Sequence, residues 1–110
     1  MLKLETKAVE FDGEYYEICC NMAALEKLEE LHGGSMKAVF ECDANHINAE
    51  LLLIMLNEAR ADKGEDPITK AHFVRRYNYA MLREMDIFGM FLRAMSPEEA
   101  NKDAGDKTKN

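Results

Sequence analysis

The stretch VEFDGEYYEICC, from Val9 to Cys20, carries the pattern of a β-hairpin. Its centre, Asp12-Gly13, favours a two-residue type I′ turn, because both positions need positive φ and these residue types tolerate it. With that turn, Phe11 pairs with Glu14 and the other pairs follow outward from it. Side chains alternate between the two faces of a strand. The apolar face then holds Val9, Phe11, Tyr16 and Ile18, and the polar face holds Glu10, Tyr15 and Glu17. A lone hairpin is only marginally stable, so the remaining chain must cover the apolar face.

Helical periodicity and capping residues predict five helices after the hairpin. The candidate N-caps are Asn21, Ser35, Thr69 and Asp86. Gly33-Gly34 favours a left-handed end of the first helix, in which Met22, Leu25, Leu28 and Leu31 lie near one face. Pro67 prevents the third helix from continuing. The predicted ranges are a hairpin at 6–20 and helices at 22–32, 36–42, 47–63, 70–84 and 87–95.

The run LLLIML, from Leu51 to Leu56, is apolar on every side for more than one helical turn. Such a helix lies at the centre of a protein and is covered on several faces. The preceding DANH, residues 43–46, is predicted to be a polar break. The fold class is therefore α+β, mostly α, with an N-terminal β-hairpin packed on a bundle of four or five helices. Residues 1–95 are predicted to form a single globular domain, and the polar residues 96–110 a flexible tail.

The charge balance argues against binding to a phosphate backbone. The chain of 110 residues has 21 acidic and 14 basic side chains and a formal net charge of −7. Nucleic-acid binders usually present a basic face. No apolar run reaches membrane-spanning length, and the N-terminus lacks the apolar core of a signal peptide. We therefore expect a cytoplasmic protein that does not bind membranes.

The candidate metal ligands and nucleophiles are Cys19, Cys20, Cys42, His32, His46 and His72. They show none of the usual zinc-ligand spacings, such as C-x₂-C or H-x₃-H. The chain also lacks a G-x-S-x-G motif and a glycine-rich phosphate loop between a strand and a helix. We interpret the cysteines as reduced, with Cys19 on the polar face of the hairpin and Cys20 on the apolar one. The sequence thus predicts a protein that is not an enzyme and binds no metal or cofactor.

One segment, Thr69 to Arg83, keeps nucleic-acid binding open as an alternative. Its basic residues are Arg75, Arg76 and Arg83, and its tyrosines, Tyr77 and Tyr79, are of a type that stacks on bases. The negative charge of the chain makes this the less favoured interpretation.

Methionine is unusually frequent, with 8 residues in the chain. Methionine adapts to irregular apolar partners and recurs on surfaces that bind varied hydrophobic segments. The alternative for any one of these residues is plain core filling. The hypothesis is a partner-binding face formed by Met81, Met85, Phe88, Met90, Phe91 and Met95.

The order of several segments resembles the small tail assembly chaperones of long-tailed, siphovirus-type bacteriophages and prophages. These segments are EFDG-x-YYEI, AALEKLEELHGGS, LLLIMLNEAR and ITKAHFVRRY, within roughly Val9 to Met95. The resemblance implies a non-catalytic protein that binds the tape measure protein, keeps it soluble and helps recruit tail tube subunits. It also implies residence in the host bacterial cytoplasm and absence from the mature virion.

The same resemblance implies a frameshift-extended form of the chaperone, which contacts the tail tube protein in many relatives. Several copies along one client would add avidity, so we expect a homo-oligomer. An acidic exterior would keep such an assembly soluble. The competing interpretations are a generic helical protein-binding adaptor or regulator and, less favoured, a small nucleic-acid-binding regulator.

Overall fold

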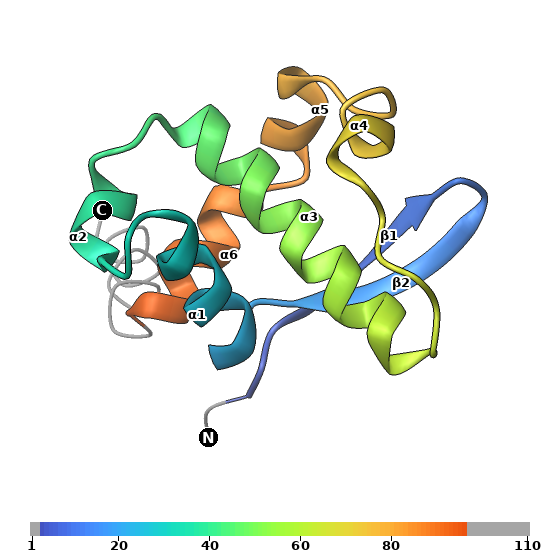
Figure 1. Ribbon diagram of the computed structural model, residues 1–110, viewed down its shortest axis with the longest axis horizontal. Helices are drawn as coiled ribbons and strands as arrows, with labels where there is room; N and C mark the ends of the chain where they lie inside the picture. Colours follow the sequence, from blue (N-terminus) through green and yellow to red (C-terminus); the bar gives the residue numbers. More distant parts are fainter. Residues whose placement is uncertain (1–2, 97–110) are drawn as a thin grey trace, which may run out of the picture.

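A computed structural model of the chain describes residues 3–96 and shows an N-terminal hairpin packed on helices (Figure 1). The two antiparallel strands are β1 (Thr6–Phe11) and β2 (Glu14–Cys19). The helices are α1 (Met22–Leu31), α2 (Met36–Phe40), α3 (Ala44–Asp62), α4 (Lys70–Phe73), α5 (Tyr79–Glu84) and α6 (Ile87–Met95). The predicted fold class, α+β and mostly α, is confirmed. The tail predicted at 96–110 lies, apart from Ser96, outside the described residues.

The hairpin has the turn and the register that the sequence predicts. Asp12 and Gly13 have φ values of 51° and 84°, as a type I′ turn requires. Phe11 pairs with Glu14, and the register runs back to Thr6 opposite Cys19. The predicted apolar face is buried, with Val9, Phe11, Tyr16 and Ile18 each at most 5% exposed. The hairpin therefore covers one side of the helices.

Tyr16 joins the hairpin to the end of α3. Its hydroxyl lies 2.8 Å from a carboxylate oxygen of Glu14 and 3.0 Å from one of Glu65, and it donates its proton to one of them at a time. The same hydroxyl accepts a hydrogen bond of 3.0 Å from Arg60. The ammonium of Lys63 lies 4.4 Å from the ring centroid, within cation–π distance. Burial, together with the two carboxylates, raises the pKa of Tyr16 to about 12.

The central position predicted for the LLLIML helix is confirmed. α3 contacts β2, α1, α5 and α6 and runs across the hairpin (Figure 1). Its buried apolar residues are Ile47, Leu51, Leu52, Met55 and Leu56. Leu53 and Ile54, on another side of the same helix, are only partly buried.

The predicted polar break at residues 43–46 is wrong, because α3 begins at Ala44. Asp43 is the N-cap, and its carboxylate accepts a hydrogen bond of 3.4 Å from the backbone of Asn45. Aspartate at this position satisfies a backbone donor that would otherwise lack a partner. The polar residues after Asp43 therefore form the first turn of the helix.

The continuous helix predicted at 70–84 is also wrong, since α4 ends at Phe73 and α5 begins at Tyr79. The side chain of Asn78 accepts a hydrogen bond of 2.9 Å from the backbone N–H of Met81 and so starts a new helix. Asparagine side chains offer the backbone such local bonds in competition with helix continuation. The break lets the hydroxyl of Tyr77 donate to the backbone oxygen of Glu10 at 2.9 Å.

The predicted N-caps are confirmed at Asn21, Ser35 and Thr69, whose side chains each accept from a backbone N–H three residues later. Asp86 occupies the N-cap position of α6 as predicted, but its side chain does not cap the helix. This residue precedes α6 with a left-handed φ of 57° and makes no side-chain capping bond among the described residues. Its carboxylate lies close to Gly89 in the first turn of α6 and accepts a hydrogen bond of 3.0 Å from Arg93.

Candidate functional site

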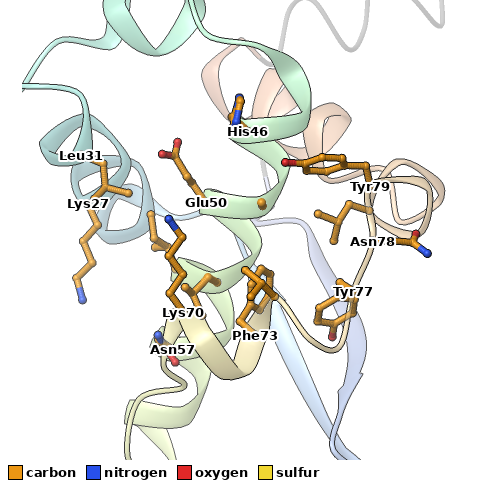
Figure 2. A pocket seen from close by; sticks show the side chains of 15 residues that line it. Lys27, Leu31, His46, Glu50, Asn57, Lys70, Phe73, Tyr77, Asn78 and Tyr79 are labelled. Atoms are coloured by element: carbon orange, nitrogen blue, oxygen red, sulfur yellow. The ribbon is translucent and has the colours of Figure 1, made fainter.

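An apolar groove of about 790 Å³ lies along α3, between α1 on one side and α4 with α5 on the other. Figure 2 shows Lys27 and Leu31 on the α1 side and Phe73, Tyr77 and Tyr79 on the opposite side. Concave, mainly apolar surfaces of this size are typical of binding sites. The groove is therefore the candidate functional site.

The floor of the groove is one stripe of α3. Ala49, Leu53 and Ile54 lie on it, and each is partly exposed. Ala49 and Leu53 lie four positions apart and so share a helix face, and Ile54, the next residue, widens the apolar floor. The stripe is the side of LLLIML that the other described elements leave open. Most large apolar side chains of α3 are thus buried in the core, and those on one side line the groove.

Two exposed apolar side chains border the floor. Leu31, the last residue of α1, is 59% exposed, and Val74, the C-cap of α4, is 54% exposed. The sequence placed Met22, Leu25, Leu28 and Leu31 near one face of the first helix; of these four only Leu28 is buried, and Leu31 at the helix end is exposed. The reason is that α1 ends here: the backbone N–H of Gly34 donates to Glu29 at 2.8 Å and turns the chain away.

Polar side chains of the groove link α3 to α1 and to the segment before α4 by hydrogen bonds. Lys27 donates to Glu58 at 2.6 Å, joining α1 to α3, and this hydrogen bond raises the pKa of Lys27. The Asn57 side chain donates to the backbone oxygen of Ile68 at 3.2 Å and accepts from its N–H at 2.7 Å. Lys70 also lines the groove, and its ammonium has no hydrogen-bond or ion-pair partner within residues 3–96. The groove thus combines an apolar floor with an unpaired cation.

The six residues predicted as a partner-binding face do not form one exposed surface. Met90 and Phe91 are buried, at 1% and 0% exposed, because this side of α6 faces the core. Including them in a surface was wrong. Met81 and Met95 are exposed, whereas Met85 and Phe88 are only partly exposed. Partner binding by these four remains a prediction, and none of the six lines the groove.

Three residues of the segment 69–83, Arg76, Tyr77 and Arg83, make side-chain hydrogen bonds within the fold, whereas Arg75 and Tyr79 are exposed. Arg76 donates to the carboxylate of Asp12 at 2.6 Å, a bond that lowers the pKa of Asp12. Tyr77 bonds Glu10, as described above, and Arg83 donates to a side chain of α3 at 3.2 Å. Arg76 and Tyr77 therefore fasten the hairpin to the segment after α4.

The cysteines at the end of the hairpin occupy the predicted faces. Cys20 is buried, and this burial raises the pKa of its thiol to about 12. Cys19 is partly exposed, and burial raises the pKa of its thiol as well, with further contributions from the carboxylates of Asp62 and Glu58. Neither thiol favours the reactive thiolate form.

Three residues that are distant in the sequence, His32, Glu50 and Cys42, lie together in the structure. His32 lies 2.7 Å from the carboxylate of Glu50 and 3.3 Å from the sulfur of Cys42. The sequence separations are 18 and 10 residues, and no local motif relates them. Across residues 3–96, no group of three or more His, Cys, Asp or Glu side chains is arranged to hold a metal ion.

The comparisons with known proteins return no relative. The chain matches no protein-family model, and no significant match was found among curated proteins or among solved structures. In the part of the chain that the structure describes, no helix has the length and apolarity needed to cross a bilayer.

Proposed function

We propose that this protein is a non-catalytic phage tail assembly chaperone, which uses the α3 groove to bind amphipathic helical segments of a tape measure protein. The observation that carries the proposal is the apolar floor of the groove, Leu53 and Ile54, bordered by the exposed Leu31 and Val74. Grooves of this kind bind the apolar face of a helix through anchors at positions i, i+3 or i+4, and i+7.

The length of the floor suits about two turns of a client helix. The α3 residues that line the groove run from His46 to Asn57, eleven positions or about 16.5 Å at 1.5 Å per residue, which leaves room for two turns. Anchors at i and i+7 of a bound helix lie roughly 10 Å apart on the same scale. A short contact of this size gives modest affinity, so a long client would be held by many copies of the chaperone. Self-association and recruitment of tail tube subunits, also by a frameshift-extended form, belong to the same proposal.

Charge supports the solubilising part of the proposal. The formal net charge of −7 disfavours self-precipitation when apolar client segments are bound. At the groove itself, Lys70 offers a positive charge to a carboxylate on the client helix. The preferred client is therefore a helix with an apolar stripe and an acidic residue beside it. The site of action in this proposal is the host cytoplasm, and the chaperone leaves before the virion is complete.

A co-expression experiment tests the proposal. A helical tape measure fragment is produced with the wild-type protein, with Leu31→Gln/Val74→Gln, or with the matched control Leu4→Gln/Met22→Gln. All four positions are more than half exposed, but only Leu31 and Val74 line the groove. Glutamine is neutral and a good helix former, so folding should be preserved, which circular dichroism verifies.

We expect the wild type and the control to keep most of the fragment in the supernatant, and the groove variant to retain less than a third of that amount. Equal solubilisation by the groove variant would refute the groove as the binding site. A fragment that stays insoluble with the wild type would refute the chaperone function.

A further inference from the structure

A second site lies beside the groove, where three elements meet. Cys42 follows α2, His32 is the C-cap of α1, and Glu50 belongs to α3. The Cys42 sulfur lies 3.3 Å from Nδ1 of His32, and Nε2 of the same ring lies 2.7 Å from Oε1 of Glu50. In Figure 2 the Glu50 side chain extends from α3 toward the α1 side. The result is a hydrogen-bonded chain of thiol, imidazole and carboxylate.

The order of groups in this chain is the one that activates a thiol. The carboxylate of Glu50 accepts the Nε2–H of His32, which fixes the tautomer and leaves Nδ1 as the acceptor for the thiol proton. A nucleophile bonded to a base that a third group orients is the arrangement shared by activated cysteines and serines. Cys42 is partly exposed, so the residue borders solvent.

We propose that Cys42 is a modification site for low-molecular-weight disulfides, with His32 as the base and Glu50 as a positioning residue. The thiol proton of Cys42 passes to Nδ1 of His32, and the thiolate attacks one sulfur of a disulfide RS–SR. The S–S bond of the reagent breaks, a mixed disulfide forms on Cys42, and RS⁻ leaves and takes the proton from the imidazolium. The disulfide is the oxidant, so the reaction balances without another reagent.

The neighbouring charges select among disulfides. The carboxylates of Glu41 and Asp43 flank Cys42 in the chain, and both residues are exposed. They attract a cationic reagent and repel an anionic one. The preferred class is therefore a small cationic disulfide, of which cystamine is a suitable probe. This inference does not depend on the proposed chaperone function.

The other two cysteines provide internal controls. Cys20 is buried, and Cys19 is partly exposed like Cys42 but has a thiol pKa raised by burial and by nearby carboxylates. The reduced full-length protein is mixed with cystamine, quenched with acid at intervals, and mapped by peptide mass spectrometry. Each cysteine then yields its own rate in the same sample.

We expect Cys42 to react at least tenfold faster than Cys19. His32→Asn should lower the Cys42 rate at least tenfold and leave the Cys19 rate unchanged. Simple loosening of the site would instead expose Cys42 and raise its rate. Glu50→Gln, which keeps an acceptor for Nε2–H, should retain most of the rate, whereas Glu50→Ala should lose it.

Equal rates for Cys42 and Cys19 in the wild type would overturn the proposal, as would an unchanged or faster Cys42 in His32→Asn. Oxidised glutathione, which is anionic, should react with Cys42 several-fold more slowly than cystamine, after correction for the intrinsic reactivity of each reagent toward a free thiol. Equal corrected rates would overturn the assignment of cationic disulfides as the preferred class.

Discussion

Removal of one hydroxyl, by Tyr16→Phe, tests how the hairpin is fastened to α3. The ring stays in the core, where Tyr16 is 1% exposed, and keeps its contact with Lys63. The variant loses the hydrogen bond accepted from Arg60 and the one donated to Glu14 or Glu65.

The size of the effect follows from the partners of the hydroxyl. A hydrogen bond to a charged group contributes about 1.5–3 kcal/mol. Glu14 is exposed and Glu65 and Arg60 are partly exposed, so water replaces part of the lost bonding. We therefore expect Tyr16→Phe to lower the free energy of unfolding by about 1–2 kcal/mol at pH 7.

The stabilisation should also depend on pH. A tyrosine in an unfolded chain loses its proton near pH 10, whereas burial raises the pKa of folded Tyr16 to about 12. Between these values the unfolded state binds fewer protons than the folded state, so stability falls as pH rises. The contribution is complete below pH 10 and is lost as the pH approaches and passes 12. The difference between wild type and Tyr16→Phe should shrink over the same interval.

Urea denaturation followed by circular dichroism measures these differences at pH 7 and at several values between 9 and 12. Tyr15→Phe is the matched control, because Tyr15 is the adjacent residue, undergoes the same chemical change and is 68% exposed. Its effect should stay within about 0.5 kcal/mol. Equal stability of wild type and Tyr16→Phe at pH 7, or a difference that does not change with pH, would refute the role assigned to the hydroxyl.

Three further predictions concern the helices, each measured by urea denaturation. Asn78→Ala removes the N-cap side chain of α5 and should lower the free energy of unfolding by about 1 kcal/mol. An unchanged stability would show that the cap is dispensable. Asn48→Leu should be neutral or stabilising, because Asn48 is 3% exposed and its side-chain oxygen has no hydrogen-bond partner within residues 3–96; a loss above about 1 kcal/mol would contradict this. Leu52→Ala should lower the free energy of unfolding by about 2–5 kcal/mol, since Leu52 is fully buried. Leu53→Ala in the groove should lower it much less, and equal losses would mean that Leu53 belongs to the core.

The parts of the fold that the sequence predicted correctly depend on local chemistry. Asp12-Gly13 defines the turn by the φ values that it tolerates, and the turn then fixes the register of every pair in the hairpin. Gly33-Gly34 likewise ends α1 through left-handed backbone conformations, with φ of 72° and 81°. These outcomes are decided within a few residues, so no knowledge of the tertiary structure is needed.

The incorrect predictions arose where a local pattern has two solutions. The apolar spacing from Phe73 to Leu82 fits one continuous helix as well as it fits two short ones. The choice depends on the side-chain bond of Asn78 and on the distant hydrogen bond from Tyr77 to Glu10. Long-range geometry also explains why the site made by Cys42, His32 and Glu50 was missed, because it exists only once α1, α2 and α3 have packed.

The groove was missed for a different reason, since its residues had already been assigned to the core. A helix that is apolar on every side is normally interpreted as wholly buried. In α3 the buried side is sufficient to hold the hairpin, α1, α5 and α6 together, and the side with Leu53 and Ile54 remains available. The proposed binding surface on α3 is held in place by the core residues beneath it. Such a surface loses little conformational entropy when a partner binds, so even a short apolar contact can contribute usefully to affinity.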